Sequence, residues 1–122
     1  MKKALVLMAL ISGTVSLATA QIKKSSQTVT IKTPTVQCES CKQRIENYLA
    51  KEEGVYKAVV DYRRKTAKVS FYTERTNVEV IKAAIANAGY DADDVAANAD
   101  SYNKLPKCCK KPEDGGGMPK KN

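Results

Sequence analysis

The segment Thr35-Val36-Gln37-Cys38-Glu39-Ser40-Cys41-Lys42 places two cysteines three positions apart, where a β-like stretch gives way to an amphipathic helix. At the start of a helix, free backbone N–H groups and the macrodipole stabilise thiolate over thiol. A lowered pKa serves a metal ligand and a redox nucleophile equally well. The spacing of Cys38 and Cys41 therefore leaves two possibilities. The pair either binds one soft metal ion on an open rim of the domain or forms a disulfide.

Four stretches around this segment have the composition of β-strands, with β-branched or apolar residues alternating with polar ones. Val29 and Ile31 share one face of the first stretch, and Val69 and Phe71 share one face of the third. The expected strands are residues 28–33, 55–61, 66–72 and a weak fourth at 90–96.

Two further stretches have the period of α-helices. The second is expected to start at Thr76, which forms a capping box with Glu79, and to close at Gly89. The first begins near Glu39 and ends before Gly54, and its inner face is expected to comprise Cys41, Ile45, Tyr48 and Leu49.

The order β-α-β-β-α-β predicts a ferredoxin-like α+β sandwich. Such a sandwich has a four-stranded antiparallel sheet with two helices on one face. The expected core comprises Ile31, Val36, Ile45, Leu49, Val55, Val60, Val69, Phe71, Ile81 and Ile85.

The ends of the chain differ in composition from this domain. Residues 1–20 have a basic head, an apolar run and a small-residue cleavage motif, which predict a signal peptide cut after Ala20. The mature protein is then expected to be periplasmic or secreted and not integral to the membrane. A flexible lead-in (21–27), a folded domain (28–96) and a disordered tail rich in Cys and Lys (97–122) are expected to follow.

The amino-acid composition limits the kinds of site and activity that the chain can have. The chain has a net charge of +8, four cysteines and no histidine. Without histidine, any metal site rests on thiolates, and the commonest general base is absent, so no enzyme activity is expected. The basic residues gather at the chain ends without interleaved aromatic residues, which argues against a nucleic-acid partner.

Two thiolates with no histidine or carboxylate cluster suit a soft ion that accepts few ligands, and Cu(I) is the leading candidate. Zn(II) prefers four ligands and would need two more. A thiol–disulfide oxidoreductase using the same pair is an alternative, although the hairpin after the first helix departs from the thioredoxin order of elements. A third alternative is an adaptor module with structural thiols.

Several short motifs carry a family resemblance across residues 28–95. They are Val36-Gln37-Cys38-Glu39-Ser40-Cys41, Gly54-Val55, Val69-Ser70-Phe71 and Ala88-Gly89-Tyr90-Asp91. With them the chain resembles the heavy-metal-associated domain of copper chaperones, metal-exporting P-type ATPases and periplasmic mercury-binding proteins. It departs from the family motif Gly-Met-x-Cys-x-x-Cys by having Thr35 for the glycine and Val36 for the methionine.

The resemblance implies a metallochaperone or scavenger in which Cys38 and Cys41 bind Cu(I), or alternatively Hg(II), Cd(II) or Zn(II). It implies that Tyr90 lies beside the metal loop and limits solvent access, and that Val36 packs under that loop. The implied acceptor is a metal-transporting ATPase or another thiolate protein. The implied state is a monomer or a metal-bridged dimer.

Cys108 and Cys109 form a second pair, flanked by Lys107, Lys110 and Lys111. Adjacent cysteines seldom bond to each other, because the ring is strained. One interpretation is an accessory metal site, or an arm that completes the coordination at the first pair. The other is a disordered tail whose thiols pair with another chain.

Overall fold

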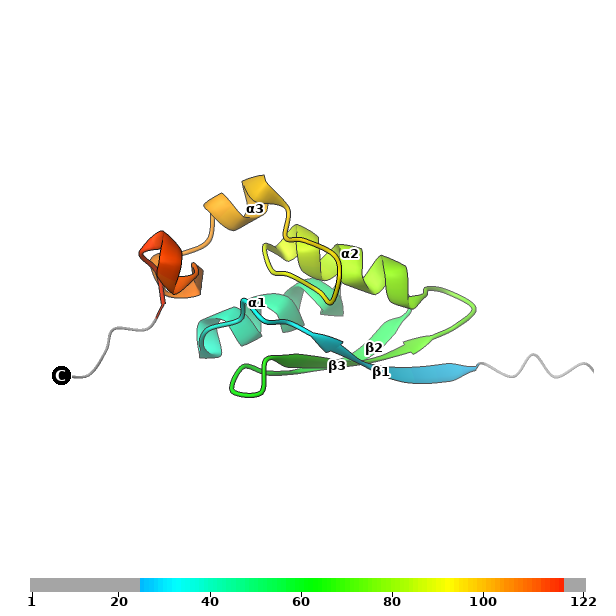
Figure 1. Cartoon of the computed structure of the whole chain (residues 1–122). Coiled ribbons are helices and arrows are strands. Elements are labelled where there is room, and N and C mark those ends of the chain that lie inside the picture. The colour runs from blue at the N-terminus through cyan, green and yellow to red at the C-terminus, as the bar shows by residue number, and fades with distance from the viewer. Residues whose placement is uncertain (1–24, 118–122) are drawn as a thin grey trace, which may run out of the picture.

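The computed structural model describes residues 25–117. It contains three strands, β1 (Ser26–Lys32), β2 (Val55–Asp61) and β3 (Thr66–Tyr72), and two main helices, α1 (Glu39–Ala50) and α2 (Val78–Ala88). Both helices cover the same face of the sheet (Figure 1). The predicted α+β arrangement is thus confirmed. The predicted signal peptide and residues 118–122 lie outside the described part of the chain.

The sheet has the order β1-β3-β2, and both pairings are antiparallel. β1 starts at Ser26, so the expected flexible lead-in already belongs to a strand at its last two residues. The expected core residues are buried, except Val55, which is only partly buried at the start of β2. Tyr48, expected on the inner face of α1, is 41% exposed instead.

The predicted fourth strand does not form, and the sheet has three strands within residues 25–117. Asp93 adopts a left-handed conformation with φ 50°, which breaks the extended backbone that a strand needs. A single backbone bond remains beside β1, from Asp93 N to the Lys32 carbonyl at 2.8 Å. The Asp93 carboxylate accepts from Lys32 N at 2.7 Å. A side chain thus takes the place of one rung of the ladder.

The start of α2 also differs from the prediction. Asn77 is the N-cap, and its side chain accepts a hydrogen bond from Val80 N at 3.0 Å. Thr76 is buried, and its hydroxyl has no hydrogen bond to another described residue. The pattern at Thr76 and Glu79 therefore placed the cap one residue too early.

The prediction of a disordered tail is wrong for residues 97–117. They form α3 (Ala99–Asn103) and two short 3-10 turns, η1 (Lys107–Cys109) and η2 (Pro112–Asp114). In Figure 1 the two turns lie beyond the first turn of α1, and η1 packs against that helix. Leu105 is 7% exposed and fits over Gly89, where a Cβ would come within 3.1 Å of it. One buried leucine among lysines and prolines is too weak a signal for periodicity to detect.

Replacing Asn77 with Ala is expected to lower the free energy of unfolding by about 1 kcal/mol, because it removes the cap of α2. Thr76→Val keeps the shape of its side chain and removes a buried hydroxyl without a partner. It is therefore expected to be neutral or stabilising. Urea unfolding of both variants distinguishes the two assignments, and the opposite ranking would mean that Thr76 caps the helix.

Candidate metal centre

Cys38 occupies the N-cap position of α1 with an extended backbone, φ −153° and ψ 178°. Its carbonyl accepts the first helical hydrogen bond, from Lys42 N at 3.1 Å. Cys41 follows in the first turn and belongs to the buried face of α1 with Ile45 and Leu49. The predicted placement at the start of the helix is therefore the observed one, and packing of the helix fixes the direction of the Cys41 sulfur.

The loop before Cys38 is held by three contacts. Val36 is fully buried under the loop. The Lys65 ammonium donates to the Val36 carbonyl at 2.6 Å. The Thr35 hydroxyl accepts from Asp91 N at 3.0 Å, which ties the loop to the segment after α2. Sequence reasoning missed the roles of Lys65 and Thr35, because both depend on contacts between segments far apart in the chain.

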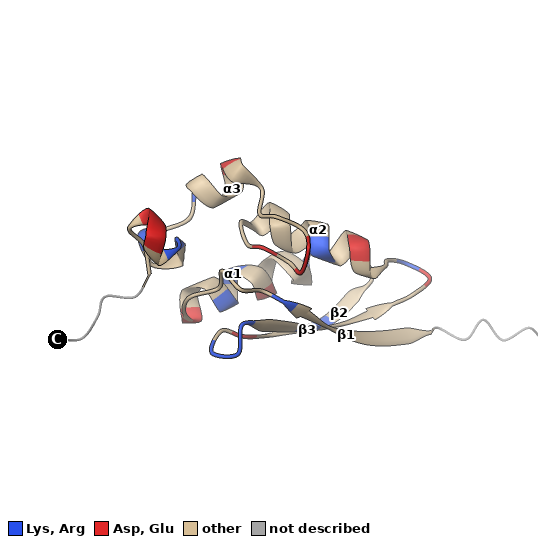
Figure 2. Cartoon of the chain, viewed as in Figure 1, with Lys and Arg blue, Asp and Glu red and all other residues tan. Residues whose placement is uncertain are grey.

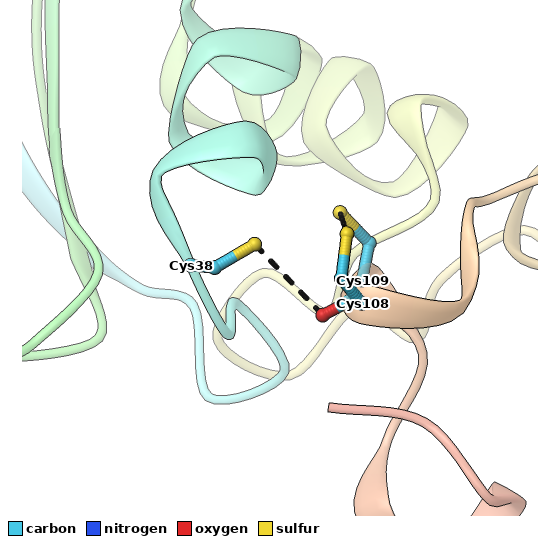
Figure 3. A group of neighbouring side chains, drawn as sticks. All are labelled: Cys38, Cys108 and Cys109. Atoms are coloured by element: carbon cyan, nitrogen blue, oxygen red, sulfur yellow. Dashed lines mark hydrogen bonds between the residues drawn. The ribbon is translucent and has the colours of Figure 1, made fainter. Parts of the chain in front are cut away.

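All four cysteines of the chain gather at the start of α1. The sulfurs of Cys38 and Cys41 are 3.4 Å apart, and those of Cys41 and Cys109 are 2.6 Å apart. Figure 3 shows the Cys38 sulfur directed toward η1, where its thiol donates to the Cys108 carbonyl at 3.8 Å. The sulfurs of Cys38, Cys108 and Cys109 all lie within 4.8 Å of one another.

The pair was expected on an open rim, and the structure shows it covered. Cys38 is 5% exposed, and Cys41 and Cys109 are fully buried. The covering residues are those of η1, which the sequence placed in a disordered tail. A surface pocket still reaches the cluster, and it is lined by Gln37, Cys38, Glu39, Ser40, Tyr62 and Cys108.

The thiols of Cys38 and Cys109 differ in acidity. Burial acts to raise the pKa of Cys38, but the backbone N–H and thiol of Cys41 and the N–H of Ser40 outweigh it, so that pKa lies below its usual value. Burial raises the pKa of Cys109, and its contact with Cys41 raises it further. Cys38 is therefore the thiol of these two that more readily supplies a thiolate.

Tyr90 is fully buried beside the cluster. Burial raises the pKa of its hydroxyl, and the neighbouring thiols of Cys109 and Cys41 raise it further. The hydroxyl makes no hydrogen bond of ordinary geometry with another residue in the described chain. Tyr90 therefore places an uncharged hydroxyl against the thiols of Cys109 and Cys41.

Basic and acidic residues both lie at this end of the molecule, with Glu113 and Asp114 in η2 and Glu39 in the first turn of α1. Figure 2 shows the basic β2–β3 loop, which contains Arg63, Arg64 and Lys65, at the same end as η1. Cys38 and Cys41 offer sulfur alone, and soft ions prefer such ligands. The fold and this cluster of thiols define a small domain suited to holding one soft metal ion.

The chain belongs to the heavy-metal-associated domain family, whose model matches residues 30–91. The mercuric transport protein periplasmic component of Shewanella putrefaciens is 41% identical over 64 residues, which are 52% of this chain and 70% of that protein. Within residues 25–117, no helix combines the length and apolar character needed to span a membrane.

Two solved structures share the fold. Oxidized MerP from Ralstonia metallidurans CH34 superposes with a TM-score of 0.54 at 33% identity, covering 57% of this chain and 96% of that one. The N-terminal domain of a potential copper-translocating P-type ATPase from Bacillus subtilis, in its Cu(I)-loaded state, gives a TM-score of 0.54 at 28% identity. That match covers 57% of this chain and 86% of the domain.

The pKa shifts predict the order in which the reduced, metal-free thiols react with iodoacetamide. Alkylation requires the thiolate, so the rate at Cys38 is expected to rise at a lower pH than for an ordinary cysteine. The rate at Cys109 is expected to rise at a higher pH. Mass spectrometry of each site across a pH series measures both midpoints, with the urea-unfolded chain as reference. A lower midpoint at Cys109 than at Cys38 would contradict the assignment.

Proposed function

We propose that this protein is an exported carrier of one soft metal ion, which the thiolates of Cys38 and Cys41 bind and pass on by ligand exchange. The observation that carries the proposal is the pair of sulfurs 3.4 Å apart at the start of α1, in a chain without histidine. Each coordinating thiol releases its proton as the metal binds. A partner's thiolate then attacks the ion, and the sulfurs are exchanged one at a time.

Cu(I) is the first candidate ion, because it is soft and accepts two or three thiolates. The Cu(I)-loaded Bacillus subtilis domain supports it. Hg(II) is the second candidate, supported by the mercuric transport component from Shewanella putrefaciens. Cd(II) and Zn(II) rank lower, since Zn(II) favours a complete tetrahedral shell.

The periplasm is the proposed location. The pattern of residues 1–20 and the name of the Shewanella putrefaciens relative both support export. The proposed acceptor is a thiolate site on a metal-transporting ATPase or a similar protein. Arg63 and Arg64 are exposed in the β2–β3 loop and would guide an acidic partner toward the same end of the molecule.

A thiol–disulfide oxidoreductase is the second candidate, and the lowered pKa of Cys38 is the observation that favours it. The buried position of both thiols argues against it, because an oxidoreductase must present its nucleophile to a protein substrate. A purely structural role for the thiols is the third reading. It predicts neither tight metal binding nor redox activity.

Anaerobic titration of the reduced protein with Cu(I), in competition with a chelator of known affinity, tests the proposal. The double variant C38S/C41S is expected to lower the affinity more than about 100-fold, because it removes two thiolate ligands. Ser40→Ala lies between the two cysteines and leaves both thiols in place, so it serves as the matched control with near-normal affinity. The same titration with Hg(II) ranks the two ions.

Equal Cu(I) and Hg(II) binding by wild type and C38S/C41S would overturn the carrier proposal. Insulin reduction at the rate of a dedicated oxidoreductase, lost in C38S/C41S, would favour the second candidate. Sedimentation of the metal-loaded protein separates a monomer from a dimer bridged by the ion.

A further inference from the structure

Residues 105–117 are here called the cysteine cap. They add the thiols of Cys108 and Cys109 to a site for which the family motif supplies only Cys38 and Cys41. Resting on the proposed function above, we propose that Cys108 and Cys109 of this cap complete the metal site. The ion is then held by the Cys38–Cys41 pair and by at least one sulfur of the cap. The acceptor protein obtains the ion by displacing the cap sulfur.

The first reason for a further ligand is the distance between the sulfurs of Cys38 and Cys41. With metal–sulfur bonds of ~2.3 Å, a linear two-coordinate ion needs its sulfurs ~4.6 Å apart. The sulfurs of Cys38 and Cys41 are only 3.4 Å apart. At this spacing an ion bound to both sulfurs would have a bent S–metal–S angle, which would leave one side open for a further ligand.

The cysteine cap fills that side. Three sulfurs around a trigonal ion with ~2.3 Å bonds are ~4 Å apart. The Cys108 and Cys109 sulfurs are 3.9 Å apart, and both lie within 4.8 Å of the Cys38 sulfur. These distances belong to Cys38 and the two cap cysteines, so at least one cap sulfur would reach an ion held by Cys38. The Cys109 sulfur also lies 2.6 Å from that of Cys41, and these two sulfurs would have to move apart to bind the same ion.

The cap is a folded unit rather than a passing contact. The Tyr102 hydroxyl accepts from Lys111 N at 2.9 Å and donates to an Asp114 carboxylate oxygen at 2.5 Å. Gly117 N donates to the Lys107 carbonyl at 3.1 Å and closes the loop around η1. A side chain at Gly116 would collide with the Lys110 carbonyl, so the loop closes this tightly only with glycine there.

Charge and polarity at the cluster also fit a bound ion. Three thiolates around Cu(I) carry a net charge of −2, and around Hg(II) a net charge of −1. Lys107, Lys110 and Lys111 flank the cap cysteines in the sequence and would partly offset this excess, against Glu113 and Asp114 of the same cap. The buried Tyr90 hydroxyl lies against the thiols of Cys109 and Cys41, whose conversion to metal thiolates would supply an acceptor.

The pocket beside the cluster gives the direction of exchange. Cys38 and Cys108 line it, whereas Cys41 and Cys109 are fully buried behind them. A partner thiolate entering there reaches the metal from the side of Cys108. The partner's sulfur–metal bond forms, the Cys108–metal bond breaks, and the released thiolate takes a proton from solvent.

X-ray absorption of the protein loaded anaerobically with one equivalent of Cu(I) tests the proposal. Wild type is expected to show three sulfur ligands, and C108S/C109S only two. The double variant is expected to bind Cu(I) about 10-fold more weakly, because one thiolate is lost. The double variant is also expected to transfer Cu(I) to a competing chelator at least about 10-fold faster than wild type. Ser40→Ala keeps all four thiols, so as the matched control it should retain three sulfur ligands.

Two sulfur ligands in wild type, with unchanged affinity and transfer rate in C108S/C109S, would overturn the role of the cap and leave the carrier proposal standing. Undiminished binding by C38S/C41S would instead overturn the carrier proposal. Circular dichroism verifies that each variant is folded. If C108S/C109S does not fold, the single variants C108S and C109S replace it in the same comparison. At least one of them must then bind Cu(I) with fewer sulfur ligands or transfer it faster than wild type.

Discussion

The packing of α1 onto the sheet is the constraint on which the site depends. Ile45 and Leu49 are fully buried against the strands, and the same face of the helix carries Cys41. Because the rotation of the helix is set by this burial, the Cys41 sulfur has a fixed direction before any metal arrives. Cys38, as the N-cap, is placed one turn away by the same helix. In the proposed function, thiols held in place in this way would lose little conformational freedom on binding the ion.

Contacts from distant segments of the chain hold the loop that precedes this pair of cysteines. Lys65, in the turn between β2 and β3, holds the Val36 carbonyl, and Asp91 donates its N–H to Thr35. These bonds explain how the loop tolerates two departures from the family motif. The threonine replaces glycine and gains a hydrogen bond, while Val36 fills the buried space under the loop with a smaller side chain than methionine.

The cysteine cap changes the chemistry expected of the site. An exposed pair exchanges its ion with any thiol that approaches, whereas a covered cluster restricts access to the side of Cys38 and Cys108. Leu105, buried over Gly89, anchors the cap to the end of α2. The cap itself lies beyond residues 30–91, which the family model matches, and it is ordered against the family domain.

The sequence alone determined the three strands, the two main helices and the position of Cys38 and Cys41, because regular periodicity and a local cysteine spacing encode them. Only the tertiary structure decided the rest. The fourth strand was lost because Asp93 takes a left-handed conformation and bonds Lys32 through its side chain. The supposed tail folded because Leu105 and Cys109 find buried places on α1 and α2. Single apolar residues in a lysine-rich stretch carry no period, so their burial depends on a surface that exists only after the domain has folded.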